Sequence, residues 1–451
     1  MIKILDSTVD DISAALRGRT VQRDDETESV VKAIIDDVRQ RGDAALLDSA
    51  RKFDAPNLQS ILVSEDEIAN AVVDDRTIAA LRTAMERVKA FHEAQYECVS
   101  MAGYCQTGPS RRLDVIVWNT AFNPEAFENS ESTLGQRWIP VESSGVYVPG
   151  GNATYPSSVL MNAVPATVAG VDRISVTTPS GHNGSLHPAV LTALRLAGVD
   201  KAFKIGGAAA IAALALGTES VPRVDKIVGP GNRFVNEAKR QLWGQVGLDG
   251  YAGPSEVCVL ADDEANEEFA AADLLTQVEH APDNAGFLVC LSRGKLDAIL
   301  AAVERQLKGA PREDTMRKAL AGASLAIVAR DLDEAVDIVN AIAPEHLTLA
   351  VVDPEKAMKK VRNAGCILLG EYTPESAGDY CLGPSHTLPT SGAARWQSPV
   401  NVLDFLKVQS VVRLTREELQ PLIPTIEALA EVEGFPAHGF GATVRRERKK
   451  E

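Results

Sequence analysis

The feature that most constrains the fold is an alternation of short apolar strands and helices between residues 145 and 371. In its first half, strand-like segments such as DRISVTTP and DKIVGPG alternate with helical segments such as PAVLTALRLAG. A second series begins at SEVCVLAD and ends at GCILLGE. Short apolar strands joined by crossover helices require parallel sheets covered on both faces. The sequence therefore predicts an α/β protein with two such units in tandem.

The segments outside this alternation have other patterns. Residues 28–97 carry apolar side chains at three- and four-residue spacing, which predicts amphipathic helices. Residues 98–145 are punctuated by Gly, Pro and Ser, so we expect a connection with local strands such as LDVIVW. After residue 400 the pattern returns to helices and ends in a Gly-rich stretch.

Charge and composition limit the class of function. The formal net charge is −16, which argues against a nucleic-acid partner because a phosphate backbone requires a basic face. Asp6, Asp10 and Asp11 interrupt the start of the chain where a signal peptide needs an apolar run, and no later run reaches membrane-spanning length. The six cysteines are scattered without paired spacing, as expected of reduced thiols. We therefore expect a cytoplasmic protein that binds neither nucleic acid nor membrane.

Three glycine turns follow predicted strands of the first unit: 148–151 (VPGG), 205–207 (IGG) and 228–232 (VGPGN). Glycines at the carboxyl ends of parallel strands let the backbone turn into a helix whose free N–H groups hold an anion. Each turn alone also fits a simple tight connection between strand and helix. Three turns on one edge favour a ligand cleft.

Histidines gather in the second unit and the tail. His280, His346, His386 and His438 each stand beside a carboxylate, a glutamine or a turn. Gln277 lies three residues before His280, so on a helix both side chains leave the same face. One glutamine oxygen, two imidazoles and a carboxylate would suit zinc. The alternative for each histidine is a helix cap or a partner for a buried backbone group.

The motifs resemble those of the histidinol dehydrogenase family over nearly the whole chain. They occur in the expected order: VYVPGGNATYPSSVLMNAVPATVAGV, KIVGPGNRFVNEAKR, AGPSEV, QVEH, APEHL, ESAGDY, GPSHTLPT and EGFPAH. The resemblance implies a homodimer with shared active sites, in which L-histidinol is oxidised to L-histidine through the aldehyde in two NAD-dependent hydride transfers. It also implies two incomplete Rossmann-like parallel-sheet domains, with small helical appendages at both ends of the chain.

Site residues follow from the same resemblance, position by position. The acid/base pair would be Glu345 and His346. The zinc ligands would be Gln277, His280, Asp379 and His438, with His438 reaching in from the partner subunit. NAD would contact Tyr147 and Asn232. Substrate contacts would comprise the four zinc ligands together with Ser255, His346, His386 and Glu433.

The implied domains divide the chain as follows. Residues 1–28 form a helical appendage, and residues 29–144 with 256–400 form the first α/β domain, which carries most zinc and catalytic residues. Residues 145–255 form the Rossmann-like domain that contacts NAD. Residues 401–451 form a C-terminal appendage that reaches into the partner subunit.

The sequence departs from the family pattern at several positions. Ala209 stands where the family usually has a glutamine that touches NAD, and Ser385 stands where asparagine is common. The last motif contains Phe435 and Pro436 in place of the more usual leucine and a polar or acidic residue. Three alternatives therefore stay open: a dehydrogenase for another small polar, amino or sulfonated alcohol, a two-electron enzyme that stops at the aldehyde, and a non-catalytic binding protein.

Overall fold

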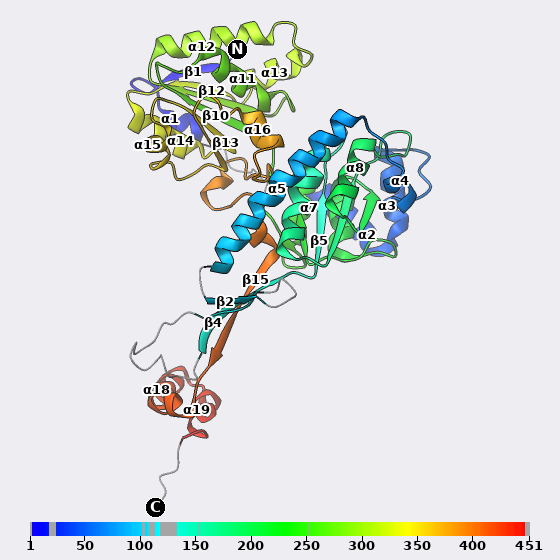
Figure 1. Cartoon of the computed structure of the whole chain (residues 1–451), viewed down its shortest axis with the longest axis vertical. Helices are drawn as coiled ribbons and strands as arrows, with labels where there is room; N and C mark the ends of the chain where they lie inside the picture. Colours follow the sequence, from blue (N-terminus) through cyan, green and yellow to red (C-terminus); the bar gives the residue numbers. More distant parts are fainter. Residues whose placement is uncertain are drawn as a thin grey trace, which may run out of the picture. The chain divides into compact units, whose positions relative to one another are not determined.

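The computed structural model describes residues 2–17, 24–101, 104–107, 113–117, 133–151, 153–250 and 252–446. The chain divides into two compact units (Figure 1). Unit 1 comprises Met1–Gln95 and Val141–Phe405, and unit 2 comprises Tyr96–Pro140 and Leu406–Glu451.

Unit 1 contains a six-stranded sheet, sheet A, in which every neighbouring pair of strands is parallel. Adjacent residues of β10 point to opposite faces, as the period of a strand requires: Val257 packs into one apolar cluster and Cys258 into the other. The order of the strands is β1 (Lys3–Asp6), β12 (Leu325–Val328), β11 (Ala285–Cys290), β10 (Glu256–Ala261), β13 (His346–Ala350) and β14 (Cys366–Leu369).

Helices cover both faces of sheet A (Figure 1). This double cover explains why its strands are apolar on both sides rather than alternating with polar residues. One face packs against α11 (Glu267–Val278), α12 (Arg293–Leu307) and α13 (Glu313–Ala321); the other packs against α1 (Ile12–Leu16), α14 (Leu332–Ile342) and α15 (Pro354–Met358).

The second sheet of unit 1, sheet B, has five parallel strands. Their order is β7 (Lys201–Lys204), β6 (Arg173–Thr178), β5 (Ser143–Tyr147), β8 (Lys226–Val228) and β9 (Gly247–Leu248). The apolar cluster on one face includes residues of α2 (Asp25–Arg41), α3 (Asp43–Phe53), α9 (Gly207–Leu216) and α10 (Arg233–Leu242). The remaining helices of unit 1 are α4 (Glu65–Ala69), α5 (Asp75–Met101, which continues into unit 2), α7 (Pro156–Ala169), α8 (Pro188–Ala197) and α16 (Glu375–Tyr380).

Unit 2 is built on a four-stranded antiparallel sheet with the order β15-β4-β3-β2. Its longest pairing joins β4 and β15 in an unbroken register from Thr133 opposite Arg413 to Pro140 opposite Leu406. The strands are β2 (Tyr104–Thr107), β3 (Leu113–Val117), β4 (Thr133–Pro140) and β15 (Leu406–Arg413), and the helices that follow are α17 (Arg416–Leu419), α18 (Ile423–Glu433) and α19 (Pro436–Thr443).

The predicted α/β class and the predicted strand and helix alternation are confirmed. The structure differs from the predicted domain division in three places. Residues 3–6 form a strand of sheet A rather than part of a helical appendage, and four residues are too few to reveal a strand period. Helices α2 and α3 pack against sheet B, whereas we assigned residues 29–144 with 256–400 to one domain. Residues 96–140 belong with 406–451 in unit 2, because β4 pairs with β15.

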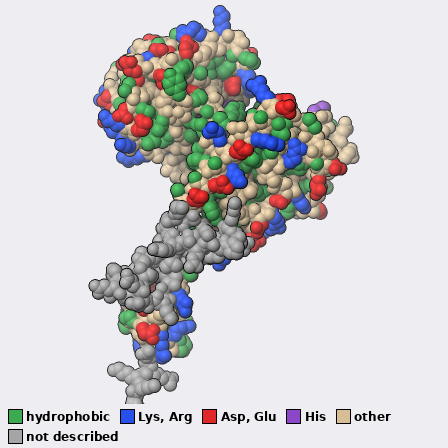
Figure 2. Space-filling model, viewed as in Figure 1, with side chains coloured by type: hydrophobic (Ala, Val, Ile, Leu, Met, Phe, Trp, Pro, Cys, Tyr) green, Lys and Arg blue, Asp and Glu red, His purple; other side chains and the backbone are tan. Residues whose placement is uncertain are grey.

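The surface of the protein is mixed in character. On the face of Figure 2, acidic and basic side chains are interspersed with apolar ones over unit 1. Among the described residues, every helix is too short or too polar to cross a lipid bilayer.

Candidate active site

Glu345 and His346 lie where the chain enters sheet A. His346 is the first residue of β13 and stands opposite Val257 on one side and Cys366 on the other. Glu345 precedes it, and its carbonyl accepts the N–H of Cys366 at 2.8 Å. Gly365 permits this approach, because a Cβ there would lie 2.6 Å from the carbonyl oxygen of Glu345. Both side chains are buried at the amino edge of the sheet, the edge opposite to that where open α/β sheets usually bind ligands.

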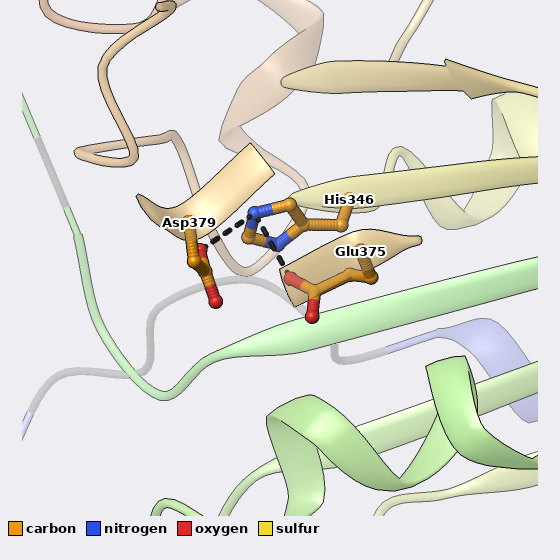
Figure 3. Close-up of side chains that lie close together, drawn as sticks. All are labelled: His346, Glu375 and Asp379. Carbon is orange, nitrogen blue, oxygen red and sulfur yellow. Dashed lines mark ion pairs between the residues drawn. The ribbon is translucent and has the colours of Figure 1, made fainter. Parts of the chain in front are cut away.

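Two carboxylates of α16 face the imidazole of His346 (Figure 3). Glu375 and Asp379 are four residues apart, so they project from one face of the helix. The Nε2 atom of His346 lies 3.3 Å from Oε1 of Glu375 and 3.4 Å from Oδ1 of Asp379. One potential ligand atom from each of the three residues lies within 4.8 Å of the others. This spacing would allow a metal ion to bind.

Gln277 joins the same cluster from the last turn of α11. Its side chain is buried, and its Nε2 donates hydrogen bonds to Glu375 and, at 2.9 Å, to Oδ2 of Asp379. The side chain of Asn284 holds this turn by donating to the carbonyl of Gln277 at 2.7 Å.

His280 lies in the turn after α11, two residues beyond the end of the helix, and not on the helix as we predicted. Glu279 is the C-cap residue of the helix, and its N–H donates to the carbonyl of Leu275 at 3.2 Å. Arg312 fixes the turn by donating to the carbonyls of Glu279 at 2.7 Å and His280 at 3.0 Å. His280 is close enough to Asp379 to help lower the pKa of that carboxyl.

Burial and charge shift the pKa values of this cluster strongly. Burial raises the pKa of Glu345 to about 8 and that of Glu375 to about 7. For Asp379, the hydrogen bond and positive charge of His346 outweigh burial, and its pKa lies below the usual value. Burial would lower the pKa of His346, but the surrounding carboxylates outweigh it and raise this pKa to about 10. These carboxylates therefore favour the protonated form of the His346 imidazole.

His386 lies in the loop after α16 and connects the cluster to α7. Its Nδ1 lies 2.9 Å from the carbonyl oxygen of Asp379 and therefore donates, because a carbonyl can only accept. Its Nε2 lies 3.2 Å from Oγ of Ser158, and burial lowers its pKa. A neutral ring that accepts a hydrogen bond from the Ser158 hydroxyl satisfies both contacts.

Ser255 directly precedes β10, and its N–H donates a hydrogen bond to Oδ1 of Asn284 at 3.2 Å.

The predicted NAD residues lie at the carboxyl edge of sheet B. Tyr147 ends β5, and its buried hydroxyl accepts the N–H of Gly207 at 3.2 Å. Asn232 caps α10, and its Oδ1 accepts the N–H groups of Phe234 and Val235 at 3.0 and 3.2 Å. Ala209 lies on α9 within the apolar core. Tyr147 and Asn232 therefore each stabilise a glycine turn. Their contact with NAD stays a prediction.

Glu433 and His438 belong to unit 2. Glu433 is the last residue of α18, and His438 lies on α19 with its ring centroid 5.2 Å from that of Phe435. Both side chains are exposed. Their predicted roles in substrate and metal binding stay predictions.

Glu375 is the site residue that our prediction left out. It is the first residue of the ESAGDY motif and has no role among the predicted site residues, yet its side chain is completely buried and contacts both Gln277 and His346. Its four-residue spacing from Asp379 was the available signal, since that spacing places two carboxylates on one helix face.

Comparisons with known proteins agree along nearly the whole chain. The family model described as histidinol dehydrogenase matches residues 17–446. The histidinol dehydrogenase of Geobacter metallireducens is 45% identical over 449 residues, covering 98% of this chain and 97% of the relative. That of Geobacter sulfurreducens is also 45% identical, covering 98% and 99%. The crystal structure of histidinol dehydrogenase from Elizabethkingia anophelis is similar with a TM-score of 0.88, at 35% identity and 98% coverage of both chains.

Proposed function

The chain belongs to the histidinol dehydrogenase family, and from this membership we propose that it oxidises L-histidinol to L-histidine with NAD as the electron acceptor. The observation that carries the proposal is the buried cluster of Glu345, His346, Glu375, Asp379 and Gln277 at the amino edge of sheet A. It places two bases and a potential cation site within one small volume.

One of the predicted zinc ligands, Asp379, belongs to the group of three side chains whose spacing would allow a metal ion to bind. The carboxylates of Glu375 and Asp379 lie close together beside the buried imidazole of His346, and a cation would compensate their negative charge. We propose zinc, held by Gln277, His280 and Asp379 together with His438 of a second copy, because zinc accepts nitrogen and oxygen ligands. Zinc, when bound, would act as a Lewis acid that holds the imidazole and amine nitrogens of the substrate.

The proton chemistry falls to Glu345 and His346. NAD, when bound, accepts the hydride in each of the two oxidations. In the first, His346 takes the proton of the substrate hydroxyl as the aldehyde forms. In the second, Glu345 takes the proton of the water that attacks the aldehyde, and the hydrated aldehyde becomes the carboxylic acid.

Two observations support these roles. Oε2 of Glu345 lies 3.9 Å from Nδ1 of His346, so both bases can serve one substrate carbon. The N–H of Glu256 donates to the same Glu345 oxygen at 2.8 Å and fixes its orientation. His346 releases its proton more readily once the carboxylate charge around it is offset by a cation.

We further propose a homodimer in which unit 2 of one copy completes the active site of the other. Helices α18 and α19 expose a set of large apolar side chains that a second copy would cover: Leu429, Val432, Phe435, Phe440 and Val444. In this arrangement the exposed Glu433 and His438 of one copy would enter the active site of the other.

A substrate panel tests the proposed activity. NADH formation is measured in zinc-supplemented buffer with L-histidinol, a sulfonated propanediol and other small amino alcohols. We expect kcat/KM for L-histidinol to exceed that of every other alcohol by about a hundredfold or more, because a site that pairs polar substrate groups rejects analogues lacking them. Turnover of another alcohol at a higher kcat/KM would contradict the assigned substrate.

A further inference from the structure

A buried ion pair lies beneath the glycine turn that follows β8. Lys239 of α10 and Asp249 are both only 3% exposed, and Nζ of Lys239 lies 2.7 Å from Oδ1 of Asp249. Apolar side chains of similar volume often stabilise a protein as well as a buried ion pair does. The pair is therefore better explained by the groups that it holds than by stability alone.

Both charged side chains bind the backbone of Gly229. Lys239 donates to its carbonyl at 2.6 Å, and Asp249 accepts its N–H at 2.7 Å through the second carboxylate oxygen. Gly229 has a φ of +119°, and a Cβ there would lie 2.1 Å from the carbonyl oxygen of Tyr147. The ion pair therefore fixes a backbone conformation, pressed against the end of β5, that only glycine adopts.

Asn236 holds the next part of the same turn. It lies one helical turn before Lys239, so both side chains project from one face of α10. Its Nδ2 donates to the carbonyls of Gly231 at 2.8 Å and Ala252 at 2.9 Å. Because the peptide after Gly231 is trans and planar, the N–H of Asn232 points away from the buried Asn236.

We infer that Lys239, Asp249 and Asn236 are positioning residues for the cofactor. They hold the turn of residues 229–232 from beneath, with two of its carbonyls turned inward and the N–H of Asn232 turned outward toward the dinucleotide. The inference rests on the proposed NAD-dependent function and on the prediction that Tyr147 and Asn232, at this edge of sheet B, contact the cofactor.

The test is the double variant Lys239→Met with Asp249→Leu, which removes both charges and leaves neither unpaired. We expect the KM for NAD to rise about tenfold or more, the effect of losing the geometry of one or two hydrogen bonds. The kcat at saturating NAD and the KM for L-histidinol should stay within about threefold of wild type. The Kd for NAD, measured by isothermal titration calorimetry, should rise with the KM.

The matched control is Lys226→Met with Asp404→Leu. It removes the 3.2 Å ion pair at the amino end of the same strand, β8, and should leave the KM and Kd for NAD unchanged. Asn236→Ala leaves no unpaired charge and serves if the Lys239 variant fails to fold; we expect its KM for NAD to rise about threefold or more.

The outcomes separate the inference from the proposed function. A folded Lys239/Asp249 variant, or a folded Asn236 variant, with wild-type KM and Kd for NAD would overturn the positioning role. An equal rise in the control would do the same, because it would reveal a general effect of stability. Wild-type protein that binds NAD but forms no NADH from L-histidinol would instead contradict the proposed function.

Discussion

Asp379→Asn is expected to lose metal binding and turnover together. The largely buried carboxylate of Asp379 lies with Oδ1 3.4 Å from Nε2 of His346. Its Oδ2 accepts a hydrogen bond from Gln277 at 2.9 Å. Asparagine keeps the size of the side chain but removes the charge that a cation needs. We expect the affinity for zinc to fall by more than about a hundredfold and kcat by about a thousandfold or more.

Zinc content after dialysis, measured by mass spectrometry, and NADH formation test this prediction. Asp404→Asn is the control, because Asp404 is also a largely buried carboxylate but pairs with Lys226, at the first residue of β8. The control should keep its metal and its activity. An Asp379→Asn protein that holds wild-type zinc with wild-type kcat would rule out the ligand role.

Glu345→Gln is expected to slow the aldehyde step far more than the alcohol step. Glutamine keeps the shape of the side chain and an oxygen that can accept the N–H of Glu256, which donates to Glu345 at 2.8 Å. It cannot take a proton from water. Loss of a positioned general base costs about a hundredfold to ten-thousandfold, so we expect the oxidation of histidinal to fall by that factor.

Single-turnover measurements started from L-histidinol and from histidinal separate the two steps. The first hydride transfer should stay within about tenfold of wild type, since His346 is intact. His346→Gln is the complementary variant and should slow the alcohol step directly. Equal rates of histidinal oxidation in wild type and Glu345→Gln would remove Glu345 from the mechanism.

The sequence predicted the parts of the fold that depend on local pattern. The strands at 173–178 and 256–261 and the helices between them follow from runs of apolar residues bounded by turns. The sheet against which α2 and α3 pack could not be predicted, because an amphipathic pattern shows only that one face of the helix is buried. The four-residue strand β1 was missed because it is too short to show a period.

Within the site, Glu345 and His346 could be predicted from the motifs of the sequence, but most of the side chains around them could not. Glu375 was overlooked because a buried carboxylate is recognised by its partners, and Gln277 lies 98 residues away in the chain. The protonated state of His346 also depends on carboxylates brought together only by folding. Which strands lie beside β13 was likewise hidden, since strand order is not encoded in local pattern.

The stoichiometry of the complete reaction tests the central claim most directly. Purified protein is incubated with limiting L-histidinol, excess NAD and zinc, and NADH and L-histidine are quantified at the end point. The account predicts two NADH and one L-histidine for each L-histidinol consumed. One NADH with accumulated aldehyde, or no consumption of L-histidinol, would contradict it.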